Sequence, residues 1–203
     1  MRRLRGGNET ARRIVRAVNE AYDVVKNDRH ADVVLAHCVQ TIRLPMRLVT
    51  EAEYAEAKPA AEQAAAQIAK DPKAADQVHG RLIWNRRTVE RFEAQKTDPK
   101  PTFEMELHVL RIGDAVVCTN PFELFTEYGI RIKSRSPAIQ TFVVQLAGHG
   151  WYLPTEAAAR GGSYSAVVHS VKVSPAGGQT LVDRTVEAIT SLWNTPEKKA
   201  GQP

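Results

Sequence analysis

The hydrophobic and polar positions near the start of the chain predict one helix followed by one strand. Between residues 11 and 25, apolar side chains recur at helical spacing, so we expect a surface helix with one buried stripe. Residues 31–44 are rich in β-branched side chains and end before Pro45, which is typical of a strand that leads into a turn. His37, inside this segment, is interpreted as a packed strand residue.

The next stretch predicts a pair of helices. Residues 50–53 have the Thr-Glu-Ala-Glu pattern of a capping box, in which the threonine and the second glutamate satisfy free N–H groups at a helix start. We expect this helix to continue through alanine-rich sequence to about Lys70, and a second helix to follow it as far as Ala94. A polar linker, residues 95–101, separates the pair from the rest of the chain.

The middle of the chain predicts a hairpin and a helix. Residues 103–119 alternate between apolar and polar positions and then turn at Gly113-Asp114 into a short apolar strand, which indicates a β-hairpin. Asn120 and Pro121 are favoured at the first positions of a helix, and that helix is expected to reach Arg135.

The last third adds one more strand and one more helix. Residues 139–146 are predicted as a buried strand that is broken at residues 148–150. Residues 151–170 are predicted as a long ordered loop, and loops of this length in a compact domain often carry function. An amphipathic helix then runs from Pro175 to Trp193. The whole pattern predicts an α/β fold in which helices flank a mixed sheet.

Composition indicates one globular domain, expected over residues 1–195, with a disordered tail at residues 196–203. The chain has 203 residues, of which 43% are hydrophobic and 25% are charged. Its net charge of +5 lies within residues 1–16, which hold six arginines and one glutamate. Basic and acidic residues balance in the remainder, which argues against a broad nucleic-acid surface, so we expect no nucleic-acid partner.

Other sequence features say little about the cellular compartment of the protein. No apolar run approaches the ~20 residues that span a bilayer, so no transmembrane segment is expected. The basic start is not followed by the apolar run of a signal peptide, and the compartment is left open. Cys38 and Cys118 lie in apolar, strand-like segments and are predicted to be free thiols.

The candidate chemistry lies between Ile112 and Tyr164. The sequence contains no P-loop, dinucleotide fingerprint, serine-hydrolase elbow or His-Glu-x-x-His motif. The Ile112 to Tyr164 block instead places Glu123, His149 and Tyr152 around two tight turns in otherwise apolar sequence. We interpret it as one wall of an active site.

The motifs IGDAVVCTNPFELF, IQTFVVQLAGHGWYLPT and GGSY in this block resemble the neutral/alkaline (non-lysosomal) ceramidase family and its bacterial relatives. The resemblance extends over about residues 6–193 and is more specific after Glu104. It implies that the chain corresponds to the C-terminal portion of a ceramidase-like catalytic domain, an incomplete half of a larger α/β hydrolytic domain. In that family, zinc is held by two histidines, a glutamate and a tyrosine, and the metal-bound water hydrolyses the amide of an N-acylsphingosine.

Glu123 matches the metal-binding glutamate of the ceramidase family. The residues alone also allow a structural interpretation: with Asn120 as the N-cap, Glu123 stands at the third helical position. A glutamate there completes a capping box and interacts favourably with the helix dipole. Both interpretations of Glu123 stay open at the level of the sequence.

Tyr152 and His149 compete for a second ligand position. Tyr152 matches the second tyrosine of a family pattern like Asn-x-Tyr-x-x-Tyr, and His149 stands where the first tyrosine is expected. A neutral imidazole binds zinc well, so either residue is a candidate. The structural alternatives are a ring that covers the core for Tyr152 and a flexible turn for His149. Tyr164 is a further candidate, for the rim of the pocket.

The resemblance does not extend to the two metal histidines and the catalytic serine of the family. Zinc is not held tightly by one carboxylate and one tyrosine without nitrogen or sulfur partners. We therefore expect a chain that is inactive alone, that is completed by a missing N-terminal half or a partner chain, and whose substrate by resemblance is a lipid amide.

Two alternatives remain open from the sequence. The first is a non-catalytic binding or assembly module, in which an exposed apolar sheet pairs with a partner chain. The second is a nucleic-acid-binding protein that uses the arginine-rich start together with Arg86, Arg87 and Arg91.

Overall fold

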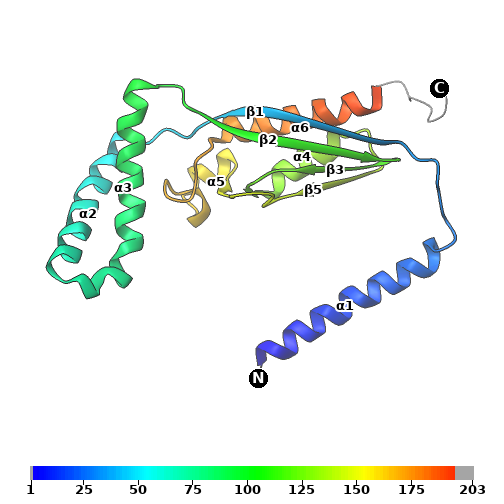
Figure 1. Ribbon diagram of the computed structural model, residues 1–203, viewed down its shortest axis with the longest axis horizontal. Helices are drawn as coiled ribbons and strands as arrows, with labels where there is room; N and C mark the ends of the chain where they lie inside the picture. Colours follow the sequence, from blue (N-terminus) through cyan, green and yellow to red (C-terminus); the bar gives the residue numbers. More distant parts are fainter. Residues whose placement is uncertain (1, 195–203) are drawn as a thin grey trace. The chain divides into compact units, whose positions relative to one another are not determined.

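The computed structural model describes residues 2–194, which divide into two compact units. Residues up to Val33 hold helix α1 (Arg2–Val25), and the second unit holds all other elements (Figure 1). The apolar side chains of α1 are exposed, Tyr22 to 58%. An amphipathic helix buries its apolar side only where another layer packs against it, and the expected buried stripe of α1 stays a prediction.

The second unit alternates strands and helices, as the pattern predicts. The expected single domain over residues 1–195 stays a prediction, and its tail at residues 196–203 lies outside the described residues. Within residues 2–194, no helix has the length and apolar character needed to cross a bilayer.

The elements of the second unit are, in order, β1 (Leu35–Pro45), α2 (Glu51–Lys70), η1 (Pro72–Ala74), α3 (Ala75–Thr97), β2 (Thr102–Ile112), β3 (Ala115–Thr119), β4 (Glu123–Leu124), α4 (Thr126–Arg135), β5 (Gln140–Val144), β6 (Tyr152–Leu153), α5 (Glu156–Arg160), η2 (Tyr164–Ala166) and α6 (Pro175–Asn194).

The main sheet has the strand order β1-β2-β3-β5. Strand β2 pairs antiparallel with β1 and β3, whereas β3 and β5 pair in parallel. The turn between β2 and β3 contains Gly113 at φ 58°, a conformation that glycine adopts without steric cost. The expected hairpin and the α/β class with a mixed, helix-flanked sheet are thus confirmed.

One face of the sheet carries the core. Strand side chains alternate between buried and exposed, and the buried set packs against α4 and α6 (Figure 1). Tyr128 of α4 donates its hydroxyl to the backbone oxygen of Pro154 at 3.0 Å and lies directly against Gly178 of α6. These contacts join the two helices into a single layer.

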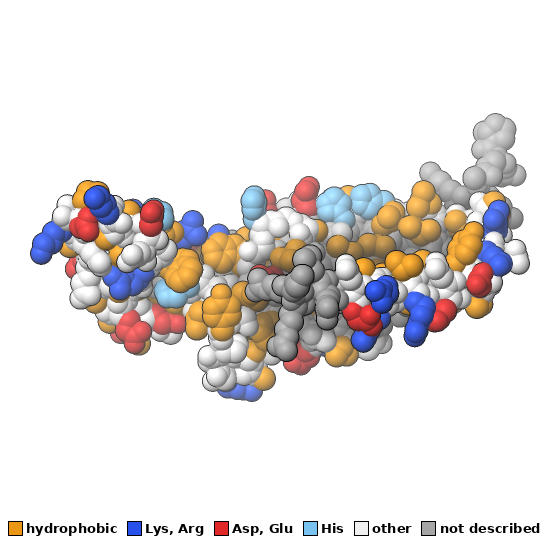
Figure 2. Space-filling model, turned by 90° about the horizontal axis from the view of Figure 1, so that it is seen from below, with side chains coloured by type: hydrophobic (Ala, Val, Ile, Leu, Met, Phe, Trp, Pro, Cys, Tyr) orange, Lys and Arg blue, Asp and Glu red, His pale blue; other side chains and the backbone are white. Residues whose placement is uncertain are grey.

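The opposite face of the sheet keeps its apolar side chains exposed. Leu35 and Val39 of β1 and Phe142 and Val144 of β5 all belong to the exposed set, Leu35 to 72%. Figure 2 shows hydrophobic side chains gathered beside histidines on one side of the molecule. A sheet face of this kind is where a further layer packs in most domains.

Helices α2 and α3 form a hairpin beyond one end of the sheet (Figure 1). The capping box of α2 is confirmed, because the Thr50 hydroxyl accepts from the Glu53 N–H and the Glu53 carboxylate accepts from the Thr50 N–H. Ala64 of α2 packs against Val78 and Leu82 of α3, so the hairpin has a small core of its own.

The expected helix at Asn120-Pro121 starts later, at Thr126. The Asn120 side chain does not cap a helix; its Oδ1 accepts from the Phe122 N–H at 3.1 Å and fixes a turn. Phe122 is fully buried, and the Glu123 N–H donates to the Trp151 oxygen at 3.0 Å. Pairing with a distant segment therefore overrides the local helix signal, and the capping-box interpretation of Glu123 is wrong.

Candidate functional site

Two of the three predicted ligand residues are neighbours in the structure. Glu123 in β4 and Tyr152 in β6 are paired Cα positions of a two-stranded parallel ladder. The Glu123 N–H donates to the Trp151 oxygen and joins the two strands, and the Tyr152 N–H donates to the Ser170 oxygen on the other side of β6, each at 3.0 Å. The carboxylate and the phenol are therefore placed side by side by backbone hydrogen bonds rather than by a flexible loop.

The electrostatics of the pair favour a protonated phenol. A hydrogen bond to the Glu123 carboxylate is the largest cause that raises the pKa of Tyr152 above its ordinary value, and the nearby charge of Glu123 adds to it. Because a tyrosine already titrates near pH 10, Tyr152 is a neutral hydrogen-bond donor at physiological pH. The pair thus offers one anionic acceptor and one neutral donor at the same point.

Tyr164 lies at the edge of this pair, as the sequence predicts. Its ring meets the Tyr152 ring edge-on, with 6.0 Å between centroids, and its side chain is 77% exposed. A large aromatic side chain that is held by its edge and open to solvent is suited to contact an apolar substrate.

His149 lies in a different environment. It lines a hollow of about 560 Å³ on the exposed sheet face, whose lining includes His37, His108 and Pro121 but neither Glu123 nor Tyr152. The arrangement therefore gives no support to His149 as a third ligand beside Glu123 and Tyr152, and that role stays a prediction.

The hollow also reveals a histidine pair that the sequence did not identify. His37 Nε2 and His108 Nδ1 are 3.3 Å apart, and the rings stack at 5.4 Å between centroids. One ring donates and the other accepts in this hydrogen bond, and the tautomers decide which ring donates. The alternation of β1 and β2 places both histidines on the exposed face, but only the strand register brings them together.

The donor set of the described residues does not complete a zinc site. Glu123 and Tyr152 supply two oxygen donors, whereas catalytic zinc takes three protein ligands that usually include histidine. Among residues 2–194, no three or more His, Cys, Asp or Glu side chains are grouped so that they could hold a metal ion. The residues present therefore fit part of such a site and not the whole.

Comparison with known proteins yields little. No protein-family model matches the chain. No curated protein matches it.

Two solved structures do match, a "Ceramidase complexed with C2" and the neutral ceramidase from Pseudomonas aeruginosa, with TM-scores of 0.40 and 0.39. Each is 16% identical to this chain, and each match covers 49% of this chain and 17% of the ceramidase chain. The matched region is thus less than a fifth of either ceramidase, and a likeness this distant carries no argument about activity.

Proposed function

We propose that this chain supplies the carboxylate and phenol side of a metal-dependent amidohydrolase site that another polypeptide completes, and that it is inactive alone. The observation that carries the proposal is the pairing of Glu123 with Tyr152 across β4 and β6. The family motifs in the sequence suggest the substrate class, a lipid amide such as an N-acylsphingosine. They also suggest zinc as the metal.

The residues of the pair have chemistry that suits amide hydrolysis. A bound metal ion would polarise the amide carbonyl and lower the pKa of a water molecule. Glu123 offers hard oxygen donors of the type that divalent metals accept, and Tyr152 offers a neutral phenol that donates a hydrogen bond. Tyr164 at the edge provides an apolar contact for the substrate chain.

The need for a second polypeptide follows from the donor count and from the sheet. Two oxygen donors leave at least one ligand position to be filled by a side chain outside the described residues. The exposed apolar face of the sheet, although separate from the pair, offers a place where a second polypeptide would pack as a further layer.

The test is zinc titration by calorimetry in a His37→Gln, His108→Gln background, because that histidine pair is a competing source of nitrogen donors. In this background we expect weak zinc binding by the otherwise unchanged chain and a loss of about tenfold in affinity, roughly 1.4 kcal/mol, for Glu123→Gln. Tyr152→Phe should weaken binding in the same direction. Glu127→Gln, which removes a nearby carboxylate that pairs with Arg131, is the matched control and should leave the affinity unchanged.

Two results would contradict the proposal. Unchanged zinc affinity in both Glu123→Gln and Tyr152→Phe would show that the pair does not hold metal. Turnover of a short-chain N-acylsphingosine by the chain alone with zinc would show that no second polypeptide is needed.

The exposed sheet face favours one alternative function, a non-catalytic assembly module. In that case a polypeptide with a complementary apolar surface packs on the face around Val39, Phe142 and Val144, and Glu123 and Tyr152 only join β4 to β6. Zinc titration separates the two functions, since the module requires no metal at the pair.

A further inference from the structure

A second cavity lies between α3 and the segment that leads into α6. Its volume is about 440 Å³, and its lining includes Trp84 and Arg87 of α3, Trp151, and His169 and Lys172 of the segment before α6. Small-molecule sites usually measure about 300–1,000 Å³, so the cavity is large enough for one organic ligand. It is separate from the Glu123 and Tyr152 pair, because neither of these residues is part of its lining.

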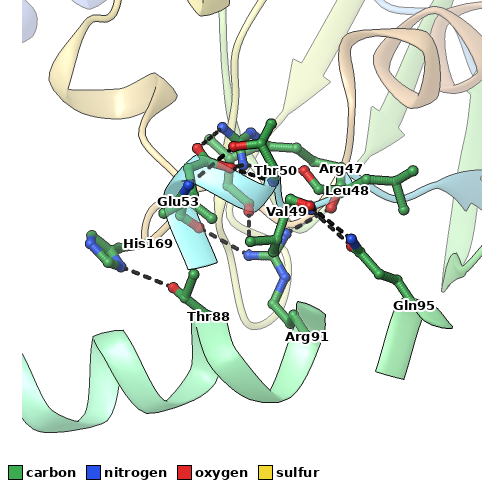
Figure 3. A network of polar contacts seen from close by, with 11 residues as sticks. Arg47, Leu48, Val49, Thr50, Glu53, Thr88, Arg91, Gln95 and His169 are labelled. Atoms are coloured by element: carbon green, nitrogen blue, oxygen red, sulfur yellow. Dashed lines mark hydrogen bonds and ion pairs between the residues drawn. The ribbon is translucent and has the colours of Figure 1, made fainter. Parts of the chain in front are cut away.

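The cavity wall is fixed by a polar network centred on Arg91 (Figure 3). Arg91 Nη1 donates to the oxygens of Val168 and Val171 at 2.9 and 3.1 Å, and Nη2 donates to the Arg47 oxygen at 2.8 Å. Arg47 in turn binds the Glu53 carboxylate at 2.5 and 3.1 Å. The segment opposite α3 is therefore held in place before any ligand arrives, which lowers the entropic cost of binding.

Two indole rings give the cavity apolar walls. The ring of His169 stacks on Trp84 at 6.0 Å between centroids, and its Nδ1 shares a hydrogen bond with the hydroxyl of the buried Thr88. On the other side, Lys172 Nζ lies 4.4 Å from the centroid of the Trp151 ring. Trp84, Thr88 and Arg91 lie on one face of α3 because they are separated by four and three residues.

Positive charge converges on the same space. Arg87, Arg91 and Lys172 line the cavity, with Glu90 as its one acidic lining residue among those described. Within residues 2–194, none of the three cations has a carboxylate at ion-pair distance; Arg91 is instead occupied by backbone oxygens. Burial, followed by the charges of Arg91 and Arg87, lowers the pKa of Lys172 below its ordinary value, so the neighbouring cations repel the charge of Lys172.

We propose that this cavity binds a small organic anion, an anionic group attached to a planar apolar body. Arg87 and Lys172 would bind the anionic group, since neither forms an ion pair with a carboxylate of the described residues. Trp84 would stack on the planar body, and Arg91 would keep the wall in place without touching the ligand.

Phenyl phosphate is a suitable probe for the whole ligand. Inorganic phosphate represents the anionic group alone, and benzyl alcohol represents the planar apolar body alone. Binding is followed by calorimetry and by quenching of tryptophan fluorescence, to which Trp84 and Trp151 contribute. We expect phenyl phosphate to bind at least about tenfold more tightly than either half probe, because only it uses both the cations and the indole.

The double variant Arg87→Gln, Lys172→Gln should bind phenyl phosphate about tenfold more weakly or worse, since charge-assisted hydrogen bonds are lost. The matched control is Arg86→Gln, which removes the adjacent exposed arginine of α3 outside the cavity lining and should leave binding unchanged. Circular dichroism verifies that each variant is folded.

The proposal is overturned by any of three results. One is equal affinity of the Arg87→Gln, Lys172→Gln variant and the unaltered chain for phenyl phosphate. Another is an equal loss with Arg86→Gln, which would indicate non-specific attraction. The third is equal binding of inorganic phosphate and phenyl phosphate, which would show that the indole wall has no role.

Discussion

At the scale of single residues, burial decides how a side chain behaves more than its type does. Cys118 lies in β3 with its thiol on the covered face of the sheet, and its side chain is 1% exposed. Burial raises the pKa of Cys118 to about 12. The prediction of free thiols is confirmed for both cysteines, with Cys118 buried and Cys38 partly so.

The raised pKa of Cys118 predicts a loss of stability in alkali. Below the pKa of an unfolded thiol, about 8.5, both states are protonated and there is no penalty. Above it, the unfolded thiol ionises while the folded thiol stays protonated up to pH 12. This linkage lowers the free energy of unfolding by about 2 kcal/mol at pH 10.

Urea unfolding at pH 7.5 and pH 10 measures this effect when the chain is compared with Cys118→Val. We expect the unaltered chain to lose about 2 kcal/mol more than the variant over this range, because valine has no proton to lose. Equal losses in both proteins would show that the Cys118 thiol is accessible to water in the folded state.

At the scale of elements, helices α4 and α6 of the covering layer approach each other closely at Gly178, where there is no side chain. A Cβ atom on Gly178 of α6 would lie 2.4 Å from both Cζ and the hydroxyl oxygen of Tyr128. The ring of Tyr128 is held in place, since its hydroxyl donates to the Pro154 oxygen and its side chain is buried. Burial also raises the pKa of Tyr128 to about 12. A glycine inside a helix normally costs stability, and here the close approach of Tyr128 explains it.

Gly178→Ala should therefore lower the free energy of unfolding by about 1–3 kcal/mol through overpacking. Gly129→Ala in α4 is the matched control, because a Cβ atom there meets nothing within 4 Å. That change should raise stability by about 0.5–1 kcal/mol, as expected from helix propensity. Thermal and urea unfolding of both variants provide the measurement, and a stabilising Gly178→Ala would contradict the packing described.

At the scale of the whole molecule, the second unit covers one face of its sheet and leaves the other open. The open face carries apolar residues from both edge strands, β1 and β5. An apolar surface of this kind is rare on monomeric proteins and usually marks an interface. This is the feature that the proposed function and its alternative share.

Replacing Phe142 and Val144 by lysine should reduce binding of an environment-sensitive naphthalene dye, measured by its fluorescence. The physical reason is that two charges on neighbouring open-face positions of β5 oppose apolar contact. Ile130→Lys is the control, since Ile130 is 60% exposed but lies on α4. An equal loss of dye binding in Ile130→Lys and in the double variant would show that the dye does not report on the open face.

Much of the fold follows from local sequence. The capping box at Thr50, the turn at Gly113 and the periodicity of α3 and α6 are properties of neighbouring residues, and the predicted elements were found there. The helix expected at Asn120 was wrong because the residues after it pair with β6, a partner that lies far away in the sequence.

In the candidate site too, some features follow from local sequence and others only from contacts between distant segments. The sequence by itself made Glu123 and Tyr152 candidates, through motifs that resemble a known family, and it determined that the chain alternates helices and strands, because motifs and periodicity are local properties. Only the tertiary structure decided that the two residues are adjacent, that His149 lines another hollow, and that Arg87 and Lys172 line one cavity together with two indole rings. Strand register and packing between distant segments fix these distances, and neither is encoded by any short stretch of sequence.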